Sequence, residues 1–123
     1  MKKQERIELT ALWYGGGYSY QLQENNIGLY RIEHKDTKVV ELKDYEIDKF
    51  WIAMDGINIW NWKKKYPYWK QEYEPLLDGC DWELKLRDKA GRVKYSKGYE
   101  SFPRSYKYLL NELNQLFSAE SEI

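Results

Sequence analysis

The sequence predicts an α+β fold, with an antiparallel sheet of five to six strands and two helices packed on one face of the sheet. Several segments alternate apolar with polar residues, which is the period of a strand with one buried face. Turn-forming glycine, asparagine and aspartate residues separate these segments. Two other stretches place apolar residues at helical spacing, and helices are the usual cover for the apolar face of a one-sided sheet.

The first third of the chain is predicted to be a β-meander. Its strand-like segments are residues 7–13, 18–22, 29–34 and 39–42. Gly15, Gly16 and Gly17 separate the first two segments, and glycine can adopt the positive φ that a tight turn needs. No helix start and no Lys-Ser/Thr pair follows them, so a phosphate-binding loop is not favoured over a turn.

The first predicted helix begins with Asp44 as its N-cap and ends at Gly56. Its apolar residues recur at i, i+3, i+4 and i+7, which places them on one face. Residues 57–60 are predicted to form a further short strand.

The strongest local signal is a hairpin between two alternating segments, residues 82–86 and 93–96. Asp88 suits the first position of a type I turn, and Gly91 suits the position with positive φ that closes the hairpin. A four-residue loop would place every large apolar side chain on one face, with the pairs Asp88–Val93, Leu86–Tyr95 and Trp82–Tyr99. A three-residue loop would leave one of the two apolar sets in water, so the sequence favours the longer loop.

The second predicted helix follows Pro103 and has Ser101 or Ser105 as its N-cap. Its apolar face consists of Tyr106, Leu109, Leu110, Leu113, Leu116 and Phe117. We expect Trp51, Leu113, Trp82 and Leu84 to share one core. Residues 118–123 are predicted to be a frayed tail.

A motif series in the second half of the chain resembles small bacterial or phage domains that carry no assigned function. The series is Asp78-Gly79, then Trp82, Leu84 and Leu86 at alternate positions, then Ser96, Gly98 and Pro103 before a closing amphipathic helix. Those domains often carry a glycine-rich aromatic stretch near their start, which residues 14–18 match. The resemblance implies a fold and neither an activity nor catalytic residues.

Composition limits the classes of function. The 123 residues, of which 33% are charged and 42% hydrophobic, predict a single domain over 1–123. No apolar run approaches the roughly 20 residues of a membrane span, and the chain starts without a signal peptide, so a cytoplasmic protein is expected. The formal net charge of zero argues against a protein whose main function is to bind nucleic acid through its phosphates. The abundance of Lys, Tyr, Asn and Ile favours an AT-rich bacterial or phage genome.

Candidate catalytic groups are few. His34 is the only histidine and has no recognisable triad partner at a suitable spacing. Cys80 is the only cysteine and lies beside Asp78 and Asp81, whose charges raise a thiol pKa. One His and one Cys make a zinc site of the usual type untenable. The sequence therefore predicts no catalytic residue, no metal and no cofactor, and favours a non-enzymatic protein.

The segment 60–73 combines aromatic residues with lysines and follows neither the strand nor the helix period. Its candidate binding residues are Trp60, Trp62, Lys63, Lys64, Lys65, Tyr66, Tyr68, Trp69, Lys70 and Tyr73. Exposed aromatic side chains can anchor a protein partner or stack on bases of single-stranded nucleic acid. In the structural interpretation, the aromatic residues instead cover an edge of the core and the lysines remain in water.

The leading hypothesis is a non-enzymatic bacterial or phage interaction protein that binds a protein partner through residues 60–73. One alternative is a small ligand-binding domain or enzyme with a pocket near the Gly15 to Gly17 turn, lined by Tyr14, Tyr18 and Tyr20. A weak single-stranded nucleic-acid binder is a further alternative, and a less favoured one because Glu72 and Glu74 partly cancel the lysine charges.

Overall fold

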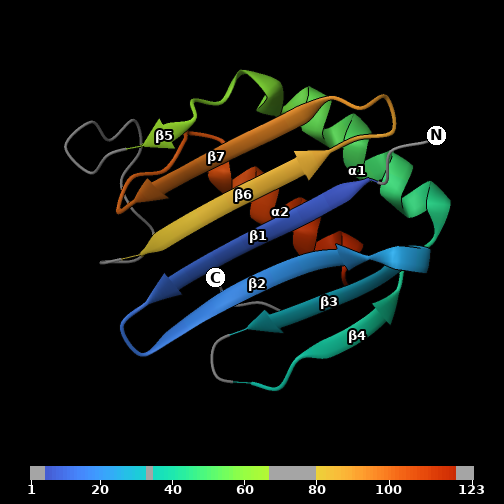
Figure 1. Cartoon of the computed structure of the whole chain (residues 1–123), viewed down its shortest axis with the longest axis horizontal. Coiled ribbons are helices and arrows are strands. Elements are labelled where there is room, and N and C mark those ends of the chain that lie inside the picture. Colours follow the sequence, from blue (N-terminus) through green and yellow to red (C-terminus); the bar gives the residue numbers. More distant parts are fainter. Residues whose placement is uncertain (1–4, 33–34, 67–79, 119–123) are drawn as a thin grey trace.

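The computed structural model describes residues 5–32, 35–66 and 80–118. Within them the fold is α+β, with one mixed, mostly antiparallel sheet and two helices (Figure 1). The strands are β1 (Arg6–Trp13), β2 (Gly16–Gln23), β3 (Ile27–Ile32), β4 (Lys38–Glu41), β5 (Lys65–Tyr66), β6 (Asp81–Arg87) and β7 (Val93–Tyr99). Their order across the sheet is β4-β3-β2-β1-β6-β7-β5.

The predicted fold class is confirmed, but the predicted sheet is not correct in detail. The described residues form seven strands rather than five to six, and β5 pairs with β7 in parallel. The strand predicted over 57–60 does not form. Asn58 adopts a left-handed conformation with φ 59°, and a 3-10 turn, Ile59–Asn61, follows it. A left-handed residue interrupts the extended backbone that a strand requires.

The β1–β2 hairpin forms as predicted, with Trp13 paired to Gly16. Tyr14 and Gly15 make the two-residue turn, and Gly15 supplies the positive φ of 90°. The other two residues of the triple glycine belong to β2. Only one of the three glycines therefore lies in the turn.

The helices are α1 (Asp44–Gly56) and α2 (Tyr106–Leu116). Asp44 is not the N-cap of α1 but its first helical residue, and its carboxylate accepts a hydrogen bond from the Asn26 side chain at 2.6 Å. Lys43 is the capping position, and its N–H donates to the Glu46 carboxylate at 3.1 Å. Of the two serines proposed as caps for α2, Ser105 holds that position. Neither of these helices is long and apolar enough to cross a membrane.

Both helices lie behind the sheet in Figure 1, against the face that carries the buried strand residues. Trp51, Leu113, Trp82 and Leu84 belong to one buried core, as predicted. The hydroxyl groups of Tyr18 in β2 and Tyr106 in α2 meet inside this core at 2.6 Å. A buried hydroxyl needs a partner, so this pair also fixes the helix against the sheet.

The β6–β7 hairpin has the predicted turn but a different register. Gly91 adopts φ 89°, and its N–H donates to the Asp88 carbonyl at 3.1 Å, which closes the turn. The Asp88 N–H donates to the Arg92 carbonyl at 3.0 Å, so the loop between this pair has three residues instead of four. The observed strand pairs are Arg87–Val93, Leu86–Lys94, Leu84–Ser96 and Trp82–Gly98.

The position of Gly98 opposite Trp82 explains this register. A Cβ atom on residue 98 would lie 2.5 Å from Trp82 Nε1 and 2.5 Å from the Ser101 carbonyl oxygen. The indole N–H donates to that same carbonyl at 2.8 Å. Tyr99, which the predicted register placed opposite Trp82, instead lies on the other face of the sheet. The expectation that all large apolar side chains share the core face is therefore wrong.

This packing predicts that Gly98→Ala destabilises the protein by about 1–3 kcal/mol, because the new methyl group must displace an indole and a backbone carbonyl. Urea unfolding followed by tryptophan fluorescence measures the loss. The matched control is Gly56→Ala, where an added Cβ meets nothing within 4 Å. Equal stability of the two variants would show that Trp82 does not lie over residue 98.

Candidate binding surface on the open face of the sheet

Neither helix covers the face of the sheet that is turned toward the viewer in Figure 1. The alternate strand residues on this open face include several exposed apolar side chains. Leu12 in β1 is 59% exposed, and Val93 in β7 is 65% exposed. Tyr99 in β7 and Val39 in β4 are also exposed. Apolar groups thus occur from one side of the open face to the other.

Charges of both signs alternate across the same face. Glu8 lies opposite Lys85 on neighbouring strands, and Glu83 lies opposite Lys97. The Glu83 carboxylate accepts a hydrogen bond from the Tyr95 hydroxyl at 2.8 Å and lies 3.3 Å from Lys85 Nζ. Both contacts lower the pKa of Glu83, and the hydrogen bond from Tyr95 has the larger effect. The face is therefore mixed in charge rather than uniformly basic or acidic.

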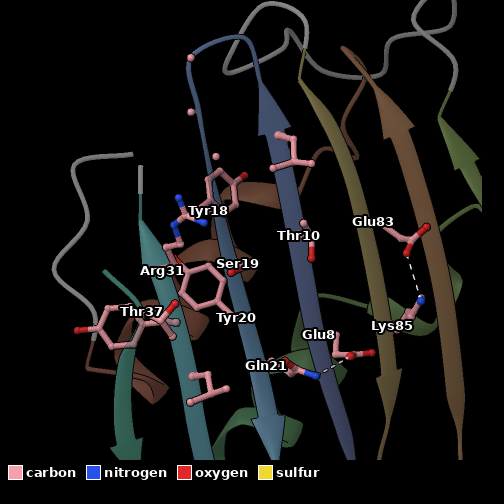
Figure 2. Close-up of a pocket in the computed structure, with 16 residues that line it drawn as sticks. Glu8, Thr10, Tyr18, Ser19, Tyr20, Gln21, Arg31, Thr37, Glu83 and Lys85 are labelled. Atoms are coloured by element: carbon pink, nitrogen blue, oxygen red, sulfur yellow. Dashed lines mark hydrogen bonds and ion pairs between the residues drawn. The ribbon is translucent and has the colours of Figure 1, made fainter. Parts of the chain in front are cut away.

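Two adjoining hollows occupy the open face. The first, of about 630 Å³, extends over β1, β2 and β3 and reaches Gly15 in the turn and the two glycines at the start of β2 (Figure 2). The second, of about 670 Å³, extends over β1, β6, β7 and β5. Thr10, Leu12 and Glu83 border both hollows, so the two form one continuous depression.

The aromatic residues described within segment 60–73 belong to the domain itself. Trp62 is buried between Trp82 and Tyr106, with ring-centroid distances of 6.2 and 6.4 Å. Tyr66 is buried against Trp82, and its hydroxyl oxygen accepts the Lys63 N–H at 2.9 Å. These positions agree with the structural interpretation of this part of the segment.

Trp60 is half-buried and lies in the 3-10 turn that follows α1. Its ring stacks on Trp51 at a centroid distance of 6.2 Å, and the Arg92 guanidinium lies 4.3 Å from the ring centroid. The indole N–H donates to Asp55 at 2.7 Å. Trp60 thereby joins α1 to the tip of the β6–β7 hairpin.

The described lysines of the segment, Lys63, Lys64 and Lys65, are exposed. Lys65 lies opposite Lys97 and borders the second hollow of the open face. The remaining candidates, Tyr68, Trp69, Lys70 and Tyr73, lie outside the described residues. The part of the segment that the structure describes thus reaches the open face through β5.

Of the three tyrosines proposed to line a pocket near the glycine turn, Tyr18 and Tyr20 border the first hollow as expected, and Tyr14 does not. The hydroxyl groups of Tyr18 and Tyr20 bond on the helix side, with Tyr106 and Asn114. Tyr14 is fully exposed at the tip of the turn. Polar residues of β1, β2 and β3 line the hollow as well, among them Thr10, Ser19, Gln21 and Arg31. The alternation of apolar and polar residues in the sequence predicts that such positions face solvent. Their proximity to one another depends on the order of the strands in the sheet, which the sequence did not predict.

The described residues include one cysteine, and its environment does not favour a thiolate. Cys80 is buried, and this burial, with a smaller effect of Asp81, raises the pKa of its thiol to about 11. Within residues 5–32, 35–66 and 80–118, no three His, Cys, Asp or Glu side chains group as metal ligands would. His34 and Asp78 lie outside these ranges.

Searches of protein-family models, curated proteins and solved structures found no match to this chain. The resemblance to small bacterial or phage domains therefore remains a prediction.

The environment of Cys80 predicts slow alkylation of the native protein. At about pH 8, a pKa raised by two units lowers the thiolate fraction about 100-fold, and burial blocks the reagent in addition. We expect native Cys80 to react with iodoacetamide at least about 100-fold more slowly than the same chain in urea. Mass spectrometry of timed samples measures both rates. Rapid alkylation of the folded protein would reveal an accessible thiolate and reopen a nucleophilic role.

Proposed function

We propose that this chain is a non-enzymatic interaction protein that binds a protein partner on the open face of its sheet. Segment 60–73 contributes to one border of the contact through Lys65. The observation that carries the proposal is the face that neither helix covers, where exposed apolar side chains of the described strands lie among charges of both signs.

The apolar groups supply the energetic argument. A side chain such as Leu12 or Val93 contributes little to folding while it remains in water, yet its burial against a partner is favourable by about 25 cal/mol per Å² of apolar surface. Tyr99 adds an aromatic side chain beside the second hollow, and aromatic residues are enriched at protein interfaces. Leu12 and Tyr99 border the same hollow, and neighbouring exposed apolar groups of this kind mark interaction surfaces.

The charge pattern favours a protein over a nucleic acid. A phosphate backbone approaching Lys85 or Lys97 would also approach Glu8 and Glu83, which lie directly opposite these lysines. Salt-dependent binding to nucleic acid scales with the number of phosphates that Lys and Arg neutralise. A protein surface, in contrast, can match each charge with its opposite.

The buried polar groups support a role without chemistry. Burial raises the pKa of the Cys80 thiol, and it raises the pKa of Tyr106 well above its ordinary value. Both groups lie inside the core, away from the open face. A catalytic acid or base needs a pKa near the working pH and contact with its substrate.

Two substitutions test the surface. A photo-crosslinking residue at position 97 first identifies the partner, and the affinity of the purified partner is then measured by calorimetry. We expect Leu12→Lys and Val93→Lys each to weaken binding at least about 10-fold, as for desolvated interface anchors, while melting temperatures stay within about 2 °C.

Ile52→Lys is the matched control, because Ile52 is 70% exposed on α1, on the helix side of the sheet. This variant is expected to bind as the unsubstituted chain does. If Ile52→Lys weakens binding as strongly as the open-face variants, or if those variants bind normally, the partner contacts another surface.

A further inference from the structure

We infer that the first hollow is a binding site for a small molecule that carries a carboxylate or phosphate group, held by Arg31. This inference does not depend on the protein contact proposed above. It concerns the end of the open face over β2 and β3, beside the glycine-rich start of β2.

Arg31 supplies the charge. Its side chain is exposed on the open face, and among the described residues no carboxylate pairs with it. The other charged groups around the hollow have partners. Glu8 bonds to Arg6 and to Gln21, and Glu83 bonds to Lys85 and Tyr95. Among the lining residues that the structure describes, the unpaired charge is therefore positive.

Hydroxyl groups extend the site from Arg31 across the sheet. Ser19 lies opposite Arg31 on β2, and Thr10 lies opposite Ser19 on β1. Side chains paired in this way are about 5 Å apart, so the three form one row across three strands. Figure 2 shows the Arg31 guanidinium reaching from β3 toward β2. A guanidinium presents a fork of N–H donors that matches a carboxylate or phosphate, and hydroxyls add single donors.

The carboxylates of the lining lie far enough away to permit an anion. The backbone of Glu8 is at least two strand spacings from that of Arg31, or at least about 10 Å, and the backbone of Glu83 is three spacings away, about 14 Å. The Debye length at physiological ionic strength is about 8 Å, so repulsion from these groups is largely screened. An anion beside Arg31 is therefore attracted by Arg31 more strongly than it is repelled by Glu8 or Glu83.

The size and walls of the hollow indicate a small molecule. Its volume of about 630 Å³ falls within the range of about 300–1,000 Å³ typical of ligand pockets. Leu12 and Leu29 give it apolar walls beside the polar row. The best match is a ligand with an apolar body and one anionic group.

The test uses the full chain, two-dimensional ¹⁵N–¹H NMR and three probes of similar size: phenyl phosphate, benzoate and the uncharged benzyl alcohol. We expect saturable shifts of the Thr10, Ser19 and Arg31 amide signals with at least one of the two anions. Benzyl alcohol is expected to bind at least about 10-fold more weakly, since it cannot form the charge-assisted bonds. The relative affinity of the two anions then distinguishes a phosphate ligand from a carboxylate ligand.

Variants assign the effect to its residue. Arg31→Gln should weaken the anion at least about 10-fold, and Ser19→Ala about 3-fold, by loss of one hydrogen bond. Arg104→Gln removes an exposed guanidinium outside the hollow and should leave binding unchanged. Shifts that do not saturate, shifts spread over surface lysines, or full binding by Arg31→Gln would overturn the inference. Val93 does not border this hollow, so none of these results bears on the effect of Val93→Lys on partner binding, and the two proposals fail separately.

Discussion

The arrangement of both faces of the sheet depends on the β6–β7 hairpin, and the carboxylate of Asp88 closes that hairpin. Asp88 is 4% exposed and accepts two hydrogen bonds from Arg92, from the backbone N–H at 2.8 Å and from Nε at 2.7 Å. This pair closes the three-residue loop and sets the register of the β6–β7 hairpin. Arg92 also reaches Asp55 at 3.0 Å and lies over Trp60, so the same contact holds the hairpin tip against the end of α1. A nearly buried carboxylate without these partners would be costly.

The register separates the core from the proposed binding surface. On the core side it places Ser96 opposite Leu84, where the serine hydroxyl donates to the Lys63 carbonyl. On that side Lys94 also donates to the Trp62 carbonyl at 2.8 Å, so β7 holds the described part of segment 60–73 in place. On the open side the register leaves Val93 and Tyr99 exposed. A shift of one residue would exchange these two sets of side chains.

Elements governed by local spacing could be predicted from the sequence, and those governed by distant contacts could not. The end of α1 at Gly56 and the Gly91 turn follow from periodicity and turn chemistry. The predicted hairpin register was wrong because it was chosen to place the most apolar side chains on one face. That criterion takes no account of a carboxylate–guanidinium pair or of the missing Cβ opposite Trp82. Trp62 could not be placed either, since its burial depends on partners 20 and 44 residues along the chain. Likewise, the polar positions of the first three strands were visible, but the row of donors exists only once those strands pair.

The register of β6 and β7 can be measured directly from Hα–Hα nuclear Overhauser effects. Directly opposed residues in a non-hydrogen-bonded antiparallel pair bring their Hα atoms closest. The structure predicts strong effects from Tyr95 to Lys85 and from Lys97 to Glu83, which lie on the open face. Strong effects from Tyr95 to Leu86 and from Lys97 to Leu84 would show the register in which the apolar residues of both strands share one face. That result would contradict the account, because Val93 and Tyr99 would then leave the open face.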